Sequence, residues 1–464
     1  MKIKIFFITL ITTLIFMRTG YNQDKPKAKV FNNGDTIIFI GNSITRAGYY
    51  ISDIYLFYQT RYPNDTIIIY NAGISGGKAS GAIKRLNKDV LLRNPGYATI
   101  MFGMNDIGYE ELYQEGLEIT QEIINKRREL IDEYKDNLSK LSTALNEEGV
   151  NIIYFTPTIY DETAESDHLN MVGKNKALYE CKQIVETEAM KNKCHTVDFY
   201  SVLDSINKMI QKESPSSSVV GKDRVHPEKM GHFIMAYTFL KSQKINPYVS
   251  KSVVNAKTMK IEESINCNIS PPKKNGNSLI FSVLEKSLPY PISKNHEGLK
   301  YVPFIDEMNK EELFVKGLQK GTYQLKIDET IIDTFTHDDL QKGINLAYYE
   351  ITPQHQQALL VKDLNEQRRY IESERLRALA LYDHGWFWIE YQENITNLSS
   401  FFNKNLEPYI GKDNYPYLRM QADNYMLFKP HENLLKQKVE DLIKSIYHAN
   451  KPFTHKYTIK SLPE

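Results

Sequence analysis

Five residues in the first half of the chain have the types and spacing that acyl transfer requires. Ser43 follows a run of β-branched and aromatic residues and a glycine, and Asp223 and His226 lie three positions apart in a later polar loop. A serine, an imidazole and a carboxylate act as nucleophile, base and orienting acid when an ester is cleaved through an acyl-enzyme. Gly76, which lets the backbone approach closely, and Asn105, which carries an amide, are suited to donate hydrogen bonds to an oxyanion. Together they predict a serine-esterase site.

Each of these residues also has an ordinary structural explanation. Ser43 is of a type that caps helices, and Asn105 is of a type common in turns. His226 on its own would be a surface histidine with a satisfied ring. For any one of these residues the structural explanation is the more common one. The occurrence of all of them at the ends of predicted strands nevertheless favours a catalytic site.

The site residues follow strands of a predicted α/β fold. Strand-like and helix-like patterns alternate through residues 36–245, which predicts a parallel sheet with helices on both faces. The strands are expected at 36–40, 66–70, 97–102, 151–155 and 196–199. The helices are expected at 49–62, 78–92, 117–148, 169–191 and 227–241. Because ligands bind at the carboxyl ends of strands in such sheets, the site residues should meet at one rim.

Four short motifs in this half resemble the blocks of the SGNH hydrolases, the GDSL esterase superfamily, in the family's order. They are GNSIT at 41–45, NAGISG at 71–76, GMND at 103–106 and DRVH at 223–226. The resemblance covers about residues 33–245 and implies a flavodoxin-like fold. It also implies Ser43 as nucleophile, His226 as base and Asp223 as its orienting acid. The implied oxyanion hole consists of the Ser43 and Gly76 N–H groups and the Asn105 side chain.

One motif departs from the family pattern, and four other side chains near the motifs need an interpretation. Asn42 stands where the family usually has an aspartate, and an amide there can still support the turn. His195 and His232 are interpreted as structural histidines. Tyr49 and Met104 either line an acyl pocket or pack in the core and rim.

Composition excludes several classes of function. The chain has 464 residues, 41% of them hydrophobic, which is enough for a large core and a smaller second unit. A formal net charge of +1 gives no electrostatic footprint for nucleic acid. No metal-ligand spacing occurs, so neither a metal site nor a cofactor is expected. Cys181 and Cys194 are spaced so that they could form a bridge, but all three cysteines, with Cys267, read more readily as small buried hydrophobes.

The N-terminus has the layout of a secretory signal peptide. Lys2 and Lys4 precede an apolar run at 5–17 that is short for a membrane span. We therefore expect a signal peptide at 1–22 and a secreted or periplasmic protein, with no stable membrane span after its removal. The cleavage site is weak, which leaves an uncleaved N-terminal anchor as the alternative.

The second half predicts a C-terminal α+β extension. Residues 256–350 form a β-rich segment, in which 279–283, 313–315, 323–327 and 331–335 are expected in a small antiparallel unit. Residues 353–464 are expected to be mainly helical, with a long helix at 353–388, a second at 432–449 and a closing strand at 456–459. Leu360, Leu364, Ile371 and Leu379 are expected on the buried face of the long helix. The catalytic domain itself is expected to span 33–248.

The substrate is the least constrained part of the prediction. Export, together with small residues around Gly76 and no contiguous apolar loop beside the motifs, favours O-acetyl groups on an extracellular oligo- or polysaccharide. Trp386 and Trp388 are available to stack on sugar rings, although such aromatics more often pack in cores. The alternatives are a lysophospholipase or lipase-type esterase, and a non-catalytic glycan-binding protein on an esterase scaffold, for which Asn42 would be a sign of decay.

Overall fold

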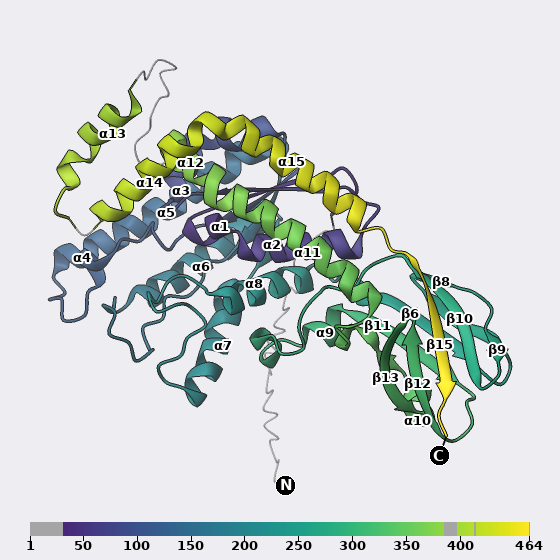
Figure 1. The fold of residues 1–464 in the computed structure, drawn as a ribbon. Coiled ribbons are helices and arrows are strands. Elements are labelled where there is room, and N and C mark those ends of the chain that lie inside the picture. Colours follow the sequence, from purple (N-terminus) through teal and green to yellow (C-terminus); the bar gives the residue numbers. More distant parts are fainter. Residues whose placement is uncertain (1–30, 385–396, 413, 464) are drawn as a thin grey trace, which may run out of the picture.

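The computed structural model describes residues 31–384, 397–412 and 414–463 (Figure 1). Its first half contains a five-stranded parallel sheet in the order β2-β1-β3-β4-β5, with helices on both faces. The strands are β1 Thr36–Gly41, β2 Ile68–Gly73, β3 Tyr97–Met101, β4 Asn151–Phe155 and β5 His195–Val197. The predicted α/β fold is confirmed. Strand β1, which lies between β2 and β3, is buried on both faces, as its unbroken apolar run predicts.

The helices of this half connect the strands and leave the carboxyl ends of the strands at one edge. They are α1 Ser43–Ala47, α2 Tyr49–Arg61, α3 Ala79–Arg85, α4 Glu110–Tyr113, α5 Gln121–Glu147, α6 Lys174–Lys191, α7 Phe199–Glu213 and α8 Lys229–Ser242. A π-helix, η1 Leu86–Val90, and a 3₁₀-helix, η2 Leu91–Arg93, continue α3.

Several boundaries differ from the sequence prediction, including the starts of α5 at Gln121 and of α6 at Lys174, which were expected at 117 and 169. Strand β2 begins at Ile68 instead of Thr66, because the amides of Thr66 and Ile67 donate to side chains, Asn33 Oδ1 at 2.9 Å and Tyr447 Oη at 3.0 Å. Helix α7 follows the last strand directly where no helix was predicted. The side chain of Asp198 caps it by accepting from the Ser201 amide at 3.0 Å.

The β-rich part forms two sheets that share one core. One has the order β13-β12-β15-β10-β8 with β9 beside β10, and the other has the order β14-β11-β6-β7. Their strands are β6 Tyr248–Asn255, β7 Lys260–Ile265, β8 Cys267–Ile269, β9 Lys273–Asn275, β10 Ser278–Glu285, β11 Lys310–Lys316, β12 Thr322–Ile327, β13 Thr330–Thr336, β14 Ile344–Asn345 and β15 Thr454–Ser461.

The predicted single antiparallel unit is therefore wrong in one respect. Strand β11, which contains 313–315, pairs in parallel with β6 and lies in a different sheet from β12 and β13. The predicted closing strand is confirmed as β15, which pairs with β10 and β12 in the middle of its sheet. The last strand of the chain thus completes a sheet that was begun some two hundred positions earlier.

Helices of the C-terminal part pack across the catalytic half (Figure 1). They are α9 Phe304–Met308, α10 His337–Lys342, α11 Pro353–Ile371, α12 Arg377–His384, α13 Leu398–Leu406, α14 Tyr415–Phe428 and α15 Glu432–Ala449, with short helices η3 Glu297–Lys300, η4 Leu346–Tyr348, η6 Glu407–Tyr409 and η7 Lys429–His431, and a π-helix, η5 Glu372–Leu376. Helix α11 contacts α2 and α15, and its Ala358 and Val361 belong to the main core.

The buried face of α11 differs from the predicted one. Ile371 and Leu379 are buried and Leu364 is half-buried, but the Leu360 side chain is 53% exposed. Polar residues occupy the buried face instead, including Asn365. A prediction that counts only apolar positions therefore assigns the wrong helix phase. Trp386 and Trp388 lie outside the described residues.

Two carboxyl groups are buried in the β-rich part. Glu311 on β11 and Glu285 on β10 are 0% and 2% exposed. Among the described residues, neither carboxyl oxygen of Glu311 has a hydrogen-bond partner, whereas Oε1 of Glu285 accepts from Tyr457 Oη at 2.9 Å. Burial raises the pKa of both groups, and the charge of Glu285 raises the pKa of Glu311 further. Burial therefore favours the protonated form of both carboxyl groups.

This pair should make the stability of the protein depend on pH. Because the pKa of Glu311 is raised in the folded state, its contribution is complete below the unfolded value of about 4.3 and is lost as the pH rises through the folded value. We expect Glu311→Gln to flatten the fall of the melting temperature as the pH rises above about 5. Glu312→Gln, half-buried on the same strand, is the matched control. An unaltered slope in Glu311→Gln would contradict the buried-proton interpretation.

Candidate active site

Ser43 is the first residue of α1 and lies directly after β1. The cap of this helix is Asn42, whose Oδ1 accepts from the Ile44 amide at 3.0 Å. The capping explanation for Ser43 is therefore wrong, and the hydroxyl of Ser43 is free for another partner. Gly41 permits the tight turn, since a Cβ there would lie 2.2 Å from Thr45 Oγ1.

A chain of two hydrogen bonds joins Ser43 to His226 and Asp223. The Ser43 Oγ and His226 Nε2 are 2.7 Å apart, and His226 Nδ1 lies 2.5 Å from Asp223 Oδ2. Asp223 Oδ1 also accepts from the amides of Val225 and His226 at 3.0 Å each. The carboxylate thus holds the imidazole with Nε2 directed at the serine hydroxyl, as the sequence predicts.

The charge on Asp223 is fixed by the same contacts. Burial alone would raise the pKa of its carboxyl group, but the hydrogen bonds from His226 and the neighbouring amides lower the pKa to about 2. The carboxylate is therefore ionised at neutral pH and can stabilise an imidazolium. The side chains of Asp223 and His226 are 49% and 47% exposed, so the pair lies at an open surface.

The loop that carries this pair is held at both ends. The Gly221 amide donates to the His226 carbonyl at 2.6 Å, and Val220 forms a β-bridge with Pro227. Arg224, with a positive φ of 66°, turns its buried guanidinium away from the pair and donates to the Asp161 carbonyl at 3.0 Å. These bonds fix the backbone of the loop, and the backbone in turn fixes the position of the His226 side chain.

The predicted oxyanion donors come from two neighbouring turns. Gly76 has a φ of 69°, a conformation that favours glycine, in a turn closed by the Gly77 amide on the Ile74 carbonyl at 2.9 Å. The amide of Ile74 donates to the Gly41 carbonyl at 3.1 Å, which links this turn to the nucleophile turn. Asn105 Nδ2 donates to the Gly77 carbonyl at 3.0 Å. An amide has two N–H donors, so the second stays available.

Two motif residues that the sequence analysis did not single out hold these turns together. Asp106 is buried and accepts from the amides of Gly103 and Ala79 at 2.9 and 2.8 Å. Burial raises the pKa of Asp106 to about 6. Asn71 donates from Nδ2 to the Thr45 carbonyl at 2.8 Å. Both residues lie inside the four motifs, and this position was the only feature of the sequence that could have indicated their role.

The remaining sequence candidates are divided between core and rim. Met104 is buried, and His232 is buried with its ring stacked on Tyr50 at 5.9 Å. Burial lowers the pKa of His232 to about 3, so it is neutral and suited to packing. His195 is half-buried at the start of β5. Tyr49, at the start of α2, lines a surface hollow.

The C-terminal part contacts α1, the helix that begins with Ser43. Arg369 Nη1 donates to the Ala47 carbonyl at 3.3 Å, and Glu374 forms an ion pair with Arg46 at 3.6 Å. Ser373 Oγ accepts from Asn71 Nδ2 at 3.3 Å. The π-helix η5 thus presents successive side chains to α1 and β2. No motif in the sequence pointed to this bracing.

Other kinds of site are not seen in the described residues. Within residues 31–384, 397–412 and 414–463, no group of three or more His, Cys, Asp or Glu side chains is placed to hold a metal ion. The three cysteines, all in that part of the chain, are free thiols, so Cys181 and Cys194 are not bridged. None of the helices described is both long and apolar enough to cross a membrane.

A parallel sheet with a serine after its first strand and a D-x-x-H motif in a later loop is the arrangement of the SGNH hydrolases. Residues 37–239 match the family model described as GDSL-like lipase/acylhydrolase. The chain belongs to this family and is a serine esterase of the SGNH type.

Two similar proteins extend this assignment. An acetylxylan esterase from Geobacillus stearothermophilus is 26% identical over 224 residues, which are 45% of this chain and 94% of that protein. The structure of a gut microbial diltiazem-metabolizing enzyme is 33% identical and covers 94% of this chain and 100% of that chain, with a TM-score of 0.84. The second match includes the C-terminal part, so both halves of the architecture recur together.

Proposed function

We propose that this protein removes acetyl groups from an O-acetylated oligo- or polysaccharide, with Ser43 as nucleophile, His226 as base and Asp223 as orienting acid. The single observation that carries the proposal is the hydrogen-bond chain from Asp223 through His226 to Ser43 at an open rim. The similarity to an acetylxylan esterase supports acetylated xylan as the first substrate to test.

The chain's own residues supply each step. His226 Nε2 takes the proton from Ser43 Oγ as that oxygen attacks the acetyl carbonyl carbon. The Ser43 and Gly76 N–H groups and the Asn105 amide receive the negative charge on the carbonyl oxygen. Collapse expels the sugar oxygen, which takes the proton from His226, and leaves Ser43 acetylated. His226 then takes a proton from a water molecule as the water oxygen attacks that ester. The intermediate collapses, Ser43 Oγ takes the proton from His226, and acetic acid leaves and ionises to acetate in solution.

The open rim suits a substrate in which a small acyl group is attached to a large alcohol. About half of each of the Asp223 and His226 side chains is exposed, and the residues from Ser75 to Lys78 are half-buried. A bulky sugar chain can therefore approach the serine from solvent. A long acyl chain would need a continuous apolar groove, and the residues at this rim are small or polar.

Location and domain division are part of the same proposal. We place a signal peptide at 1–22 and infer export to the periplasm or the medium; N-terminal sequencing of the mature protein tests both. We also propose a catalytic domain at 33–248, a β-rich segment at 256–350 and a helical segment at 353–464. Limited proteolysis that releases a stable fragment near residue 250 would support the first boundary.

The substrate test is acetate release from acetylated xylan, other acetylated plant and algal polysaccharides, p-nitrophenyl acetate and diltiazem. We expect hydrolysis of p-nitrophenyl acetate and release of acetate from at least one polysaccharide. Diltiazem is included because a structurally similar enzyme metabolizes it. Activity on p-nitrophenyl esters that rises steadily from acetate to decanoate would contradict a deacetylase. Absence of hydrolysis on every ester would indicate a binding protein.

Asn105 provides a sharper test of the oxyanion hole. We expect Asn105→Ala to lower kcat about 10²- to 10³-fold, with little change in KM, because the amide acts mainly on the charge of the transition state. Asn125→Ala, on the exposed face of α5, is the control and should retain wild-type kinetics. A kcat for Asn105→Ala within twofold of wild type would remove Asn105 from the oxyanion hole.

A further inference from the structure

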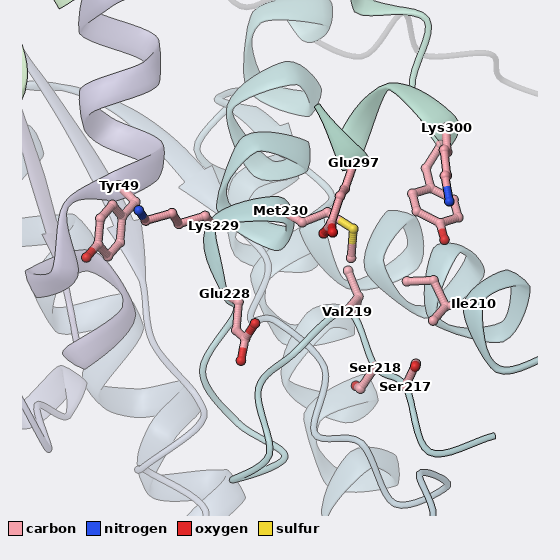
Figure 2. A pocket seen from close by; sticks show the side chains of 11 residues that line it. Tyr49, Ile210, Ser217, Ser218, Val219, Glu228, Lys229, Met230, Glu297 and Lys300 are labelled. Carbon is pink, nitrogen blue, oxygen red and sulfur yellow. The ribbon is translucent and has the colours of Figure 1, made fainter. Parts of the chain in front are cut away.

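A surface hollow of about 640 Å³ is lined by Val219 and Glu228, which flank the loop that carries Asp223 and His226 (Figure 2). Three segments line most of it: residues 217–219, residues 228–230 at the start of α8, and residues 297–301, which include η3. Pockets of a few hundred to a thousand cubic ångströms are the usual size for small ligands. The hollow is therefore large enough for a bound group, not only for solvent.

The hollow adjoins the loop of residues 220–227, which carries Asp223 and His226 and is called the catalytic loop below. Glu228 lines it and lies two positions after His226, beyond the bridge between Val220 and Pro227. A second hollow of about 570 Å³ lies along the same loop, and the two share Ser217, Ser218 and Glu228. Both hollows therefore adjoin the loop that holds the imidazole.

One wall of the hollow comes from beyond the residues that match the family model. Helix η3 lies at 297–300, whereas the match ends at 239. It is packed on α8, since the rings of Phe233 and His296 are 4.5 Å apart and a Cβ on Gly298 would lie 2.6 Å from the Phe233 ring. Because α8 begins just after the catalytic loop, η3 is held in a fixed position relative to His226.

A second wall is fixed by the C-terminal helices. Tyr49 lines the hollow, and the guanidinium of Arg369 lies 4.1 Å from the centre of its ring. The buried His232 ring lies 5.4 Å from it on another side. The tyrosine is thus held in place before any ligand arrives, which lowers the entropic cost of binding.

The lining suits a neutral, hydroxyl-rich ligand. Its charges cancel, with Glu228 and Glu297 against Lys229 and Lys300 (Figure 2). Serine and tyrosine hydroxyls add donors and acceptors. Neither a polyanion nor a polycation meets a complementary net charge here, and a long apolar chain would have to desolvate four charged side chains. A sugar chain instead offers hydroxyls to these groups and apolar ring faces to the remaining surface.

We propose that this hollow is a subsite for sugar units adjoining the one whose acetyl group is removed. The subsite rests on the proposed function and adds to it that the C-terminal part, through η3, helps to select an oligosaccharide over a small ester. Its residues bind the chain and do not take part in bond cleavage.

The test compares kinetics on acetylated xylotetraose and on p-nitrophenyl acetate for the full chain. We expect the double variant Glu297→Ala/Lys300→Ala to lower the ratio of the two kcat/KM values about tenfold, through KM for the tetraose, since a lost pair of polar contacts costs about that much. Both residues are exposed, so folding should not depend on them. Glu262→Ala/Lys316→Ala, an ion pair at 2.9 Å between β7 and β11, is the matched control and should leave the ratio unchanged.

The possible outcomes separate the subsite from the proposed function. An unchanged ratio in the double variant, or an equal loss on both substrates, would overturn the subsite. If the wild type cleaves p-nitrophenyl acetate but not the tetraose, the proposed substrate is wrong, and calorimetry with unsubstituted xylotetraose then decides about the subsite. Binding that weakens at least fivefold in the double variant would still support it, whereas absence of binding to the wild type would overturn it.

Discussion

Ser43→Ala is expected to lower kcat by about 10⁶-fold on p-nitrophenyl acetate, because loss of the nucleophile alone removes nearly all of the benefit of a catalytic triad. The proposed oxyanion donors are unchanged in this variant and should leave a residual acceleration of about 10³- to 10⁴-fold over water. His226→Ala should fall to a similar level, and the two losses should not add, since both residues act in the same step.

The measurement is initial-rate kinetics with wild-type and variant proteins prepared in parallel. Ser80→Ala is the matched control, because Ser80 lies on α3 close to Gly76 in sequence but outside the hydrogen-bond chain. It should retain wild-type kcat. A rate for Ser43→Ala within tenfold of wild type would show that hydrolysis runs through another group.

Arg377→Met is expected to cost about 3–5 kcal/mol of folding free energy, the usual penalty for breaking a buried ion pair. Arg377 on α12 is 3% exposed and holds Asp89 with two bonds of 2.7 and 2.8 Å. Its Nε also donates to the Gly73 carbonyl at 3.0 Å. Burial acts to raise the pKa of Asp89, but Arg377 and Arg85 outweigh it and hold that pKa well below its usual range. Without Arg377 the Asp89 carboxylate stays buried, and its ion pair with Arg85 offsets only part of the cost.

Urea unfolding followed by circular dichroism measures this loss. Arg128→Met is the control, because its ion pair with Glu180, at 3.0 Å, is largely exposed and should be worth less than about 1 kcal/mol. A cost below about 1 kcal/mol for Arg377→Met would mean that α12 does not brace the strand leading to Gly76.

Much of the candidate site was predictable because short stretches of sequence determine the local structure around its residues. An apolar run ending in glycine and serine specifies β1 and its turn, and the spacing of Asp223 and His226 alone permits the carboxylate to hold the imidazole. The rule that parallel strands end at one edge of a sheet places Ser43, which follows β1. It does not place His226, which lies in the loop after α7 and not at the end of a strand. The role of Asn42 as the cap of α1 was not predictable, because Ser43 is an equally good capping residue.

The parts that were missed depend on long-range contacts. The start of β2 is set by side chains of Asn33 and Tyr447, one of them nearly four hundred positions away. Leu360 was misplaced because polar partners on α2, such as Ser52 for Asn365 at 2.9 Å, decide which face of α11 is buried. Strand β11 pairs with β6 rather than with its neighbours in sequence. Local patterns identify such elements but not their partners.

The most direct test of the account is covalent labelling with diisopropyl fluorophosphate, followed by intact mass measurement and peptide mapping. The account predicts one phosphoryl group per chain, located on Ser43, with loss of esterase activity in step with labelling and no labelling in His226→Ala. A label on a different residue, or undiminished hydrolysis by fully labelled protein, would contradict it.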